Sequence, residues 1–133
     1  MNRRLLAYGL ALWLAGTLAV RLWGRFLLHP GSVLGTWLLY VVSFVAMAGL
    51  ARRLCRLAGL ARHEWPRGAV SLALPTLLLD PLSSAFFPSV FPNLTPAAAG
   101  LFGGWMLCCC AGALSGVMIG APSATSQDVV GLR

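Results

Sequence analysis

Four long apolar stretches constrain the fold of this chain more than any other feature. A helix needs about 20 residues to cross the roughly 30 Å hydrocarbon core of a bilayer, and the chain contains four stretches of about that length. They span residues 5–28, 33–50, 69–87 and 97–120. Only 10% of the residues are charged, against about 25% in a soluble domain. We predict an all-α integral membrane bundle of four helices, which forms a single domain over residues 1–133.

Two of the breaks between these stretches carry signals for the start of a helix. Ser32 is suited to cap the second helix through its side-chain oxygen. Thr95, followed by Pro96, is a suitable N-cap and first-turn pair for the fourth helix. Pro75 and Pro81 interrupt the third stretch, where each proline removes one backbone hydrogen bond from a helix.

The arginines predict the direction in which the helices cross the membrane. Eight of them lie near the termini or in the link between the second and third stretches: Arg3, Arg4, Arg52, Arg53, Arg56, Arg62, Arg67 and Arg133. Arg21 and Arg25 lie at the other end of the first stretch. Because basic residues are retained on the cytoplasmic side, we predict that both termini are cytoplasmic (N-in/C-in). Residues 51–67 then form a basic cytoplasmic loop, and residues 121–133 a cytoplasmic tail.

Two segments allow alternative interpretations. Residues 51–65 form either a basic amphipathic helix on anionic headgroups or an extension of the second helix. Residues 1–19 combine a basic start, an apolar core and small residues, a pattern that is also typical of a signal peptide. The apolar run continues past the cleavage point, and removal of the first span would disturb the charge balance across the membrane. We therefore expect a retained span.

The net charge of +7 does not indicate a nucleic-acid partner. The basic residues lie between apolar stretches, where membrane topology requires them, so the expected partner is the lipid bilayer and no nucleic acid is expected. All ten basic residues are arginine, and Ala, Gly, Leu and Pro are frequent, which is typical of a GC-rich bacterial genome. We expect a multi-pass protein of the bacterial cytoplasmic (inner) membrane.

Asp80 is the only carboxylate within the four apolar stretches. An acid at that depth is costly and usually has a partner or a function. Arg21 and Arg25 are four residues apart and share one helical face, and we predict that Asp80 pairs with Arg21 while Arg25 lies nearer the outer headgroups. Ser83 and Ser84 add hydroxyl groups one turn further out. These residues form either a structural ion pair or a polar pocket that opens outward and binds a small ligand, an anion or a proton.

Small residues recur at every fourth position of the last stretch. They are Gly100, Gly104, Cys108, Gly112, Gly116 and Gly120. Such a series lies close to one face of a helix, and small residues allow helix backbones to approach closely within a membrane. We predict that this face packs against the first span, which has its own series of alanines, or against the same span of a second copy.

No set of residues predicts catalysis. An active site needs a nucleophile, a base and a group that orients the base, and no such set can be named in this sequence. Three of the four cysteines are consecutive: Cys108, Cys109 and Cys110. Consecutive helical residues point about 100° apart, so they cannot surround one metal ion, and we expect them to pack as small apolar side chains. We predict no enzymatic activity, no metal site and no cofactor.

Five short motifs resemble those of a family of small, uncharacterised four-span bacterial membrane proteins, known as a domain of unknown function. They are Trp13-x-x-x-Thr17, Arg21-Leu22-x-Gly24, Leu79-Asp80, Phe87-Pro88-x-x-Phe91-Pro92-Asn93 and Gly100-Leu101-Phe102-x-x-Trp105. The Phe-Pro-Asn segment is the most specific, and the resemblance covers roughly residues 5–110. It implies a four-helix architecture in a bacterial inner membrane, and it implies no activity, substrate or cofactor.

Two functions follow as expectations. The first is an accessory, scaffold or partner-binding membrane protein, which associates with a second copy or with another membrane protein. The second is a small ion- or proton-coupled transporter in which Asp80 lies in an outward-opening polar pocket.

Overall fold

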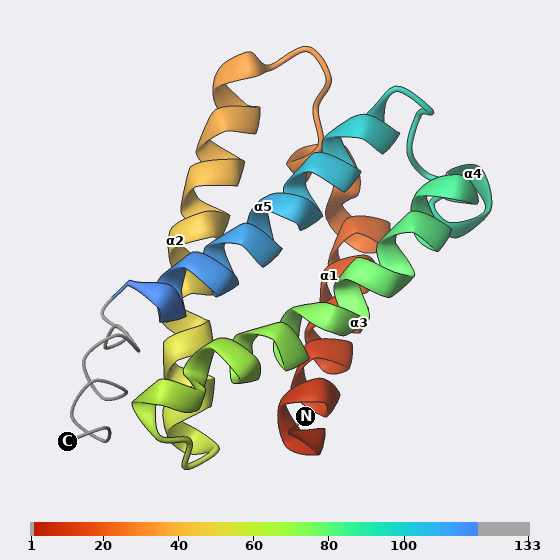
Figure 1. The fold of residues 1–133 in the computed structure, drawn as a ribbon. Coiled ribbons are helices and arrows are strands. Elements are labelled where there is room, and N and C mark those ends of the chain that lie inside the picture. Colours follow the sequence, from red (N-terminus) through yellow and green to blue (C-terminus); the bar gives the residue numbers. More distant parts are fainter. Residues whose placement is uncertain (1, 120–133) are drawn as a thin grey trace, which may run out of the picture.

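The computed structural model describes residues 2–119, in which four long helices follow one another as predicted (Figure 1). The long helices are α1 (Arg3–Leu27), α2 (Val33–Leu57), α3 (Trp65–Ala85) and α5 (Ala98–Met118). Two short elements occupy the links, the 3₁₀ helix η1 (Arg62–Glu64) and α4 (Phe87–Val90). Within the described residues, four helical segments are long and apolar enough to cross a membrane. The predicted all-α membrane bundle of four helices is confirmed.

The link between α2 and α3 is shorter than the predicted loop over residues 51–67. The second helix continues to Leu57 instead of ending near residue 50. This extension is stabilised by burial, because Ala51 and Cys55 are fully buried and belong to one apolar cluster. Gly59 then turns the chain with a φ of 70°, a left-handed conformation that glycine adopts without strain. Of the two interpretations of this segment, the extension of the second helix is therefore correct as far as Leu57.

The predicted helix signals were correct at one start and wrong at another. The Ser32 hydroxyl accepts a hydrogen bond from the Gly35 amide at 3.1 Å, as expected of an N-cap. Thr95 does not cap α5, which begins at Ala98 without a side-chain cap. The two prolines of α3 do not interrupt it, and the helix is continuous through both.

The helices are arranged as two packed pairs that are joined through α3 and α5 (Figure 1). α1 packs along α3, α2 packs along α5, and α3 packs on α5. By contrast, α1 and α2 have few contacts with each other, although a short link joins them. The bundle is therefore closed along three of its sides and splayed along the fourth, between α1 and α2.

The small-residue face of α5 packs against α2, not against α1 or a second copy as predicted. A Cβ atom added at Gly112 would clash with the backbone carbonyl of Phe44, and one added at Gly116 would clash with Ala48. Gly104 lies against the Tyr40 side chain. A Cβ atom added at Gly100 would meet no other atom within 4 Å. Gly120 lies outside the described residues. Close approach of the backbones thus determines the α2–α5 pairing.

Polar side chains reinforce this pairing along its whole length. The Tyr40 hydroxyl donates to the Leu101 carbonyl at 2.9 Å. The Trp105 indole donates to the Ser43 hydroxyl at 2.7 Å. At the far end, the Arg52 guanidinium donates to the carbonyls of Gly116 and Ile119, where the last turn of α5 leaves acceptors without intrahelical donors.

The apolar core is divided into two clusters at opposite ends of the bundle. The first cluster contains Leu5, Ala51, Cys55, Trp65, Ala69, Leu72, Ala113 and Val117. The second contains Val20, Leu28, Phe87, Phe91, Ala98, Phe102 and Met106. Within the second, the rings of Phe91 and Phe102 lie 4.8 Å apart between centroids, a distance typical of tilted aromatic pairs. The middle of the bundle lies between these clusters.

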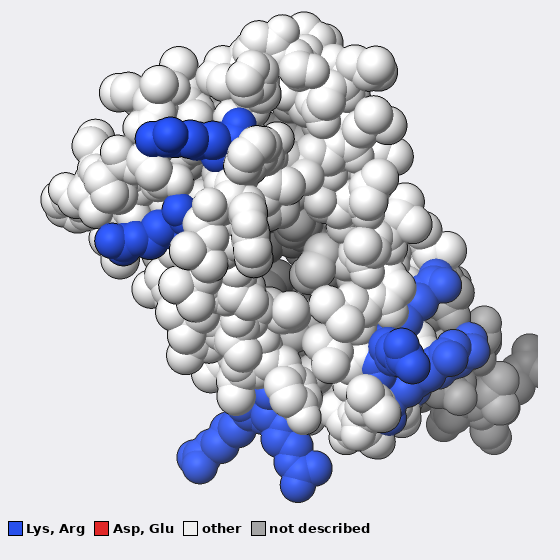
Figure 2. All heavy atoms as spheres, turned by 180° about the vertical axis from the view of Figure 1, so that it is seen from behind, with Lys and Arg blue, Asp and Glu red and all other residues white. Residues whose placement is uncertain are grey.

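The distribution of charge fits a bilayer around this middle section. Figure 2 shows basic side chains in groups at opposite ends of one face, with an uncharged band between them and no acidic atom visible. Large apolar side chains of α1 and α2 are exposed along the helices, for example Leu18, Leu22, Trp37 and Val45. In water such an exposed surface would aggregate, whereas lipid tails solvate it.

Candidate functional site

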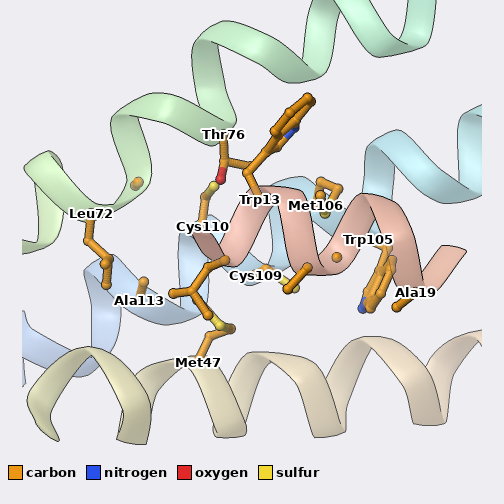
Figure 3. Close-up of a pocket in the computed structure, with 14 residues that line it drawn as sticks. Trp13, Ala19, Met47, Leu72, Thr76, Trp105, Met106, Cys109, Cys110 and Ala113 are labelled. Carbon is orange, nitrogen blue, oxygen red and sulfur yellow. The ribbon is translucent and has the colours of Figure 1, made fainter. Parts of the chain in front are cut away.

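A cavity of about 290 Å³ lies in the middle of the bundle and is lined by all four long helices (Figure 3). Its walls are mainly apolar and rich in sulfur, with Met47, Met106, Cys109 and Cys110 among the lining residues. The polar groups of the wall are the Trp13 indole and the Thr76 hydroxyl, together with the cysteine thiols and Trp105. An apolar chamber with a few polar groups is the usual form of a small-molecule site.

The cavity lies beside the splayed side of the bundle. Figure 2 shows a hollow near the middle of this face, between α1 and α2. Ala15 and Ala19 of α1 and Met47 of α2 line the cavity, and these two helices have few contacts with each other. A molecule dissolved in the hydrocarbon region would therefore meet the opening without first crossing the polar surface of the membrane.

Three buried polar atoms near this level have no hydrogen-bond partner within residues 2–119. They are the indole Nε1 of Trp13, the hydroxyl Oγ1 of Thr17 and the carboxyl Oδ1 of Asp80. Trp13 and Thr17 are four residues apart on α1 and share a face. The Trp13 ring projects from α1 toward α3 (Figure 3). Its indole lies close enough to the Asp80 carboxyl to interact with it, although the two form no hydrogen bond of good geometry.

Each of these unpartnered atoms is costly in an apolar interior. A buried polar group without a partner loses about 1–3 kcal/mol relative to a satisfied one, and in lipid no bulk water compensates. Asp80 is only 7% exposed. A concentration of unmet donors and acceptors in one region indicates a site that is completed by a water molecule or a ligand.

The predicted ion pair between Asp80 and Arg21 is not formed in the described part of the chain. The physical reason is depth along α1, because Trp13 lies opposite Asp80 and Arg21 is eight residues further on, about 12 Å at the rise of a helix. The Arg21 carbonyl instead accepts a hydrogen bond from the Asn93 amide at 2.8 Å. Arg25 donates through Nε to the Asn93 carbonyl at 3.2 Å. Both arginines therefore lie at the end of the bundle, beside the link that follows α4.

The serines of the predicted pocket remain close to Asp80. Ser84 lines a small cavity of about 160 Å³ together with Asp80, Gly103 and Leu107, between α3 and α5. Ser83 is buried, with 5% of its surface exposed. The five residues predicted as one polar site thus separate into two groups, with Asp80 and the serines in the middle and the two arginines at the end.

Sequence reasoning did not assign Trp13, Thr17 and Thr76 to the site. Trp13 and Thr17 were noted only as motif positions, although their spacing of four residues already places both on one helical face. Thr76 precedes Asp80 by four residues, which was a usable signal for the same reason. The spacing of residues within one helix does not predict which other helix this face contacts.

The Asp80 carboxyl can hold or release a proton and can accept hydrogen bonds. No group of three or more metal-binding side chains occurs in the part of the chain that the structure describes. A hydroxyl or ammonium group beside Asp80 could donate a hydrogen bond to its carboxyl oxygen Oδ1.

One comparison with known proteins gave a match. The model of a family described as "Family of unknown function (DUF5367)" matches residues 33–123, more than half of the chain. This match contains Asp80 and Asn93, whereas α1 with Trp13 lies before it. No curated protein and no solved structure matches the chain.

Proposed function

The chain belongs to DUF5367, a family of unknown function, and from its own cavity we propose that it is a small membrane carrier for a lipid-soluble ligand with one polar or cationic group. In this proposal the apolar part of the ligand occupies the central cavity and its polar group contacts Asp80. The protein performs no chemical transformation.

One observation carries the proposal, namely a buried acid without an ion-pair partner in the described chain. Asp80 lines the small cavity between α3 and α5 and lies beside Trp13, which lines the central cavity. The Asp80 Oδ1 atom is without a hydrogen-bond partner, and no arginine or histidine of residues 2–119 forms an ion pair with it. Intramembrane acids of this kind mark substrate or proton paths in many membrane proteins. A cationic ligand or a proton would neutralise Asp80, and exchange of one for the other would couple transport to protons.

The shape of the bundle supports entry from the bilayer. The opening between α1 and α2 faces the hydrocarbon region, and the lining is mainly apolar. A ligand with an apolar body therefore fits better than a hydrated ion. An ion would lose its hydration shell on entry, and the few polar groups of this wall could not replace it.

The proposal is tested by binding of a fluorescent amine to the protein reconstituted in phosphatidylcholine nanodiscs. The probe is dansylated hexanediamine, which carries one ammonium group, and its uncharged counterpart is dansylated hexylamine. Binding is followed by energy transfer from tryptophan to the dansyl group. We expect Asp80→Asn to weaken binding of the amine at least about tenfold, because a charge-assisted contact is lost, and to leave the uncharged probe almost unaffected.

Ser84→Ala is the matched control, since Ser84 lines the same small cavity as Asp80 but carries no charge. Equal affinity of the wild type and Asp80→Asn for the amine would contradict the role of Asp80. Proton movement is then measured in proteoliposomes with an internal pH indicator. Addition of the amine should change the internal pH faster for the wild type than for Asp80→Asn. Protein-free liposomes give the rate due to passive entry of the uncharged amine, and Asp80→Asn should match that rate.

An accessory, scaffold or partner-binding role is the second candidate, and the outer face of α2 favours it. The membrane-spanning window of α2 has no buried residue, and its exposed face includes Trp37, Val41 and Val45. A second copy of the chain or another membrane protein could pack there. Crosslinking from a photoreactive side chain at Val41, with Leu22 of α1 as the control position, would give a discrete product for a partner and only lipid adducts otherwise.

We also propose the bacterial cytoplasmic membrane as the location, with both termini inside. The composition, in which all ten basic residues are arginine, supports a bacterial source. The uneven distribution of these arginines between the two ends of the bundle supports the orientation.

A further inference from the structure

A second pocket, which is open at the surface, lies at the end of the bundle away from the N-terminus. Its volume is about 510 Å³. Two links form it, the end of α1 with the residues that follow it and the segment between α4 and α5. The lining residues are Arg25, Leu28, His29, Pro30, Pro92, Asn93, Leu94 and Thr95. This pocket is separate from the central cavity, with which it shares no lining residue.

The charge of the pocket is positive and uncompensated. Arg25 supplies a positive charge, His29 adds an imidazole, and none of the lining residues is acidic. The acids among residues 2–119 are Glu64, in the link between α2 and α3, and Asp80, in the middle of α3. A pocket of this kind attracts an anion.

The Arg25 guanidinium is held in position but keeps donors free. Its Nε donates to the Asn93 carbonyl at 3.2 Å, and Asn93 is itself fixed by donation from its amide to the Arg21 carbonyl at 2.8 Å. The terminal nitrogens of Arg25 form no hydrogen bond with residues 2–119, so a planar pair of donors remains for a ligand. Guanidinium groups bind phosphate with two parallel hydrogen bonds.

One residue of the pocket, Asn93, also has a hydrogen-bond acceptor without a partner. The Oδ1 atom of Asn93 is buried and has no hydrogen-bond partner in the described chain. The hydroxyl of Thr95 can donate or accept. A phosphate group in this pocket would accept hydrogen bonds from the free donors of Arg25 and from the Thr95 hydroxyl.

The position of the pocket is that of the headgroup region. It lies where the helices end, and the neighbouring aromatic side chains Trp23, Phe26 and Phe86 are exposed, as in the aromatic belt at a membrane interface. We infer that this pocket binds a phosphate group from either a phospholipid headgroup or free phosphate. Arg25 holds this group, and the Asn93 carbonyl positions Arg25.

The test uses the purified full chain in two arms. In the first, native mass spectrometry measures retention of phosphatidylglycerol and of a phosphate-free galactolipid with the same acyl chains. In the second, calorimetry measures binding of inorganic phosphate to the protein in an uncharged detergent. Each arm compares the wild type with Arg25→Gln and with Arg21→Gln, the matched control that removes an arginine one turn away and outside the pocket.

We expect Arg25→Gln to weaken phosphate-dependent binding at least about tenfold, while Arg21→Gln and the galactolipid show no such change. Dependence on Arg25 in the lipid arm alone identifies a headgroup site, and dependence in the phosphate arm alone identifies a site for the free anion. Either result supports the inference. Absence of any Arg25 dependence in both arms, or an equal loss with Arg21→Gln, would overturn it.

Folding of the variants is checked by thermal unfolding. His29→Ala serves as a second variant, because it leaves the hydrogen bond between Arg25 and Asn93 in place. This variant should weaken phosphate binding about threefold or more, because one hydrogen-bond donor is lost. If Arg25→Gln and His29→Ala both fold and both bind phosphate as the wild type does, the inference is overturned.

Discussion

Trp13 of α1 faces Asp80 of α3 in the interior of the bundle, yet the indole Nε1 and the carboxyl Oδ1 each lack a hydrogen-bond partner in the described chain. The two groups are close to each other, but neither gains a hydrogen bond of good geometry from the other. Thr17, one turn from Trp13, adds a third unmet atom. These unmet atoms are the observation on which the proposed ligand site rests.

This relationship predicts that removal of Asp80 stabilises the protein. Asp80→Leu eliminates an unpartnered polar group in the membrane interior, so the free energy of unfolding should rise by about 1–3 kcal/mol. Arg21→Leu should leave it unchanged, because the two residues do not pair. Unfolding in a denaturing detergent series measures both. Destabilisation by both variants would instead indicate the ion pair predicted from the sequence.

The α2–α5 contact predicts a sharp difference between two glycines of one helix face. Gly112→Ala should reduce the free energy of unfolding by about 1–3 kcal/mol, because the new methyl group meets the Phe44 backbone and the helices must separate. Gly100→Ala is the control, since a Cβ there meets no atom within 4 Å. Similar stability of the two variants would contradict the observed packing. Thermal unfolding monitored by circular dichroism gives the comparison.

The hydrogen bond between Trp105 and Ser43 should make a measurable contribution to the same contact. The indole donates to the hydroxyl at 2.7 Å, and hydrogen bonds between membrane helices contribute about 0.6 kcal/mol on average. A double-mutant cycle with Trp105→Phe and Ser43→Ala should therefore give a coupling energy of about that size. A coupling energy of zero would mean that the bond does not persist in the bilayer.

Arg52 should stabilise the end of α5 through its two carbonyl contacts. Arg52→Ala removes donors to the Gly116 and Ile119 carbonyls and a positive charge at a helix C-terminus, with an expected loss of about 1–2 kcal/mol. The neighbouring Arg53 is exposed and donates to neither carbonyl, so Arg53→Ala should change the free energy of unfolding by less than about 0.5 kcal/mol. The same unfolding assay compares the two variants, and equal effects would contradict the cap.

The orientation N-in/C-in predicts which links are accessible from each side. In a background with the four cysteines replaced by alanine, a single cysteine at exposed His63 should react with an impermeant maleimide only after the membrane is opened. A cysteine at exposed Ser89 should react in intact cells. The reverse pattern would establish the opposite orientation.

The number and approximate length of the helices could be predicted from the sequence because lipid leaves the backbone few choices. Each apolar stretch must satisfy its own hydrogen bonds, so it forms a helix whatever its neighbours are. The same reasoning failed at residues 51–57, where burial of Ala51 and Cys55 extends α2 beyond the predicted end. It also failed at Thr95, which is a suitable N-cap residue but does not cap α5 in the structure.

The candidate site was predictable only in part. The cost of a buried acid singled out Asp80 from the sequence alone, but not its surroundings. Arg21 was chosen as its partner by charge, whereas the pairing of α1 with α3 places Trp13 opposite Asp80 and directs Arg21 toward Asn93. The phosphate pocket brings together two links that lie far apart in the sequence.

By itself, the sequence therefore determined that this protein is a bundle of four membrane helices with one acid in its interior. Hydropathy and backbone hydrogen bonding act within each segment, so these properties can be read along the chain. Only the tertiary structure decided that the glycine face of α5 meets α2, that α1 and α2 remain apart, and that Asp80 faces Trp13. These features depend on how the helices rotate and pair, which is decided by close packing between segments. The spacing of residues within a single segment does not determine it.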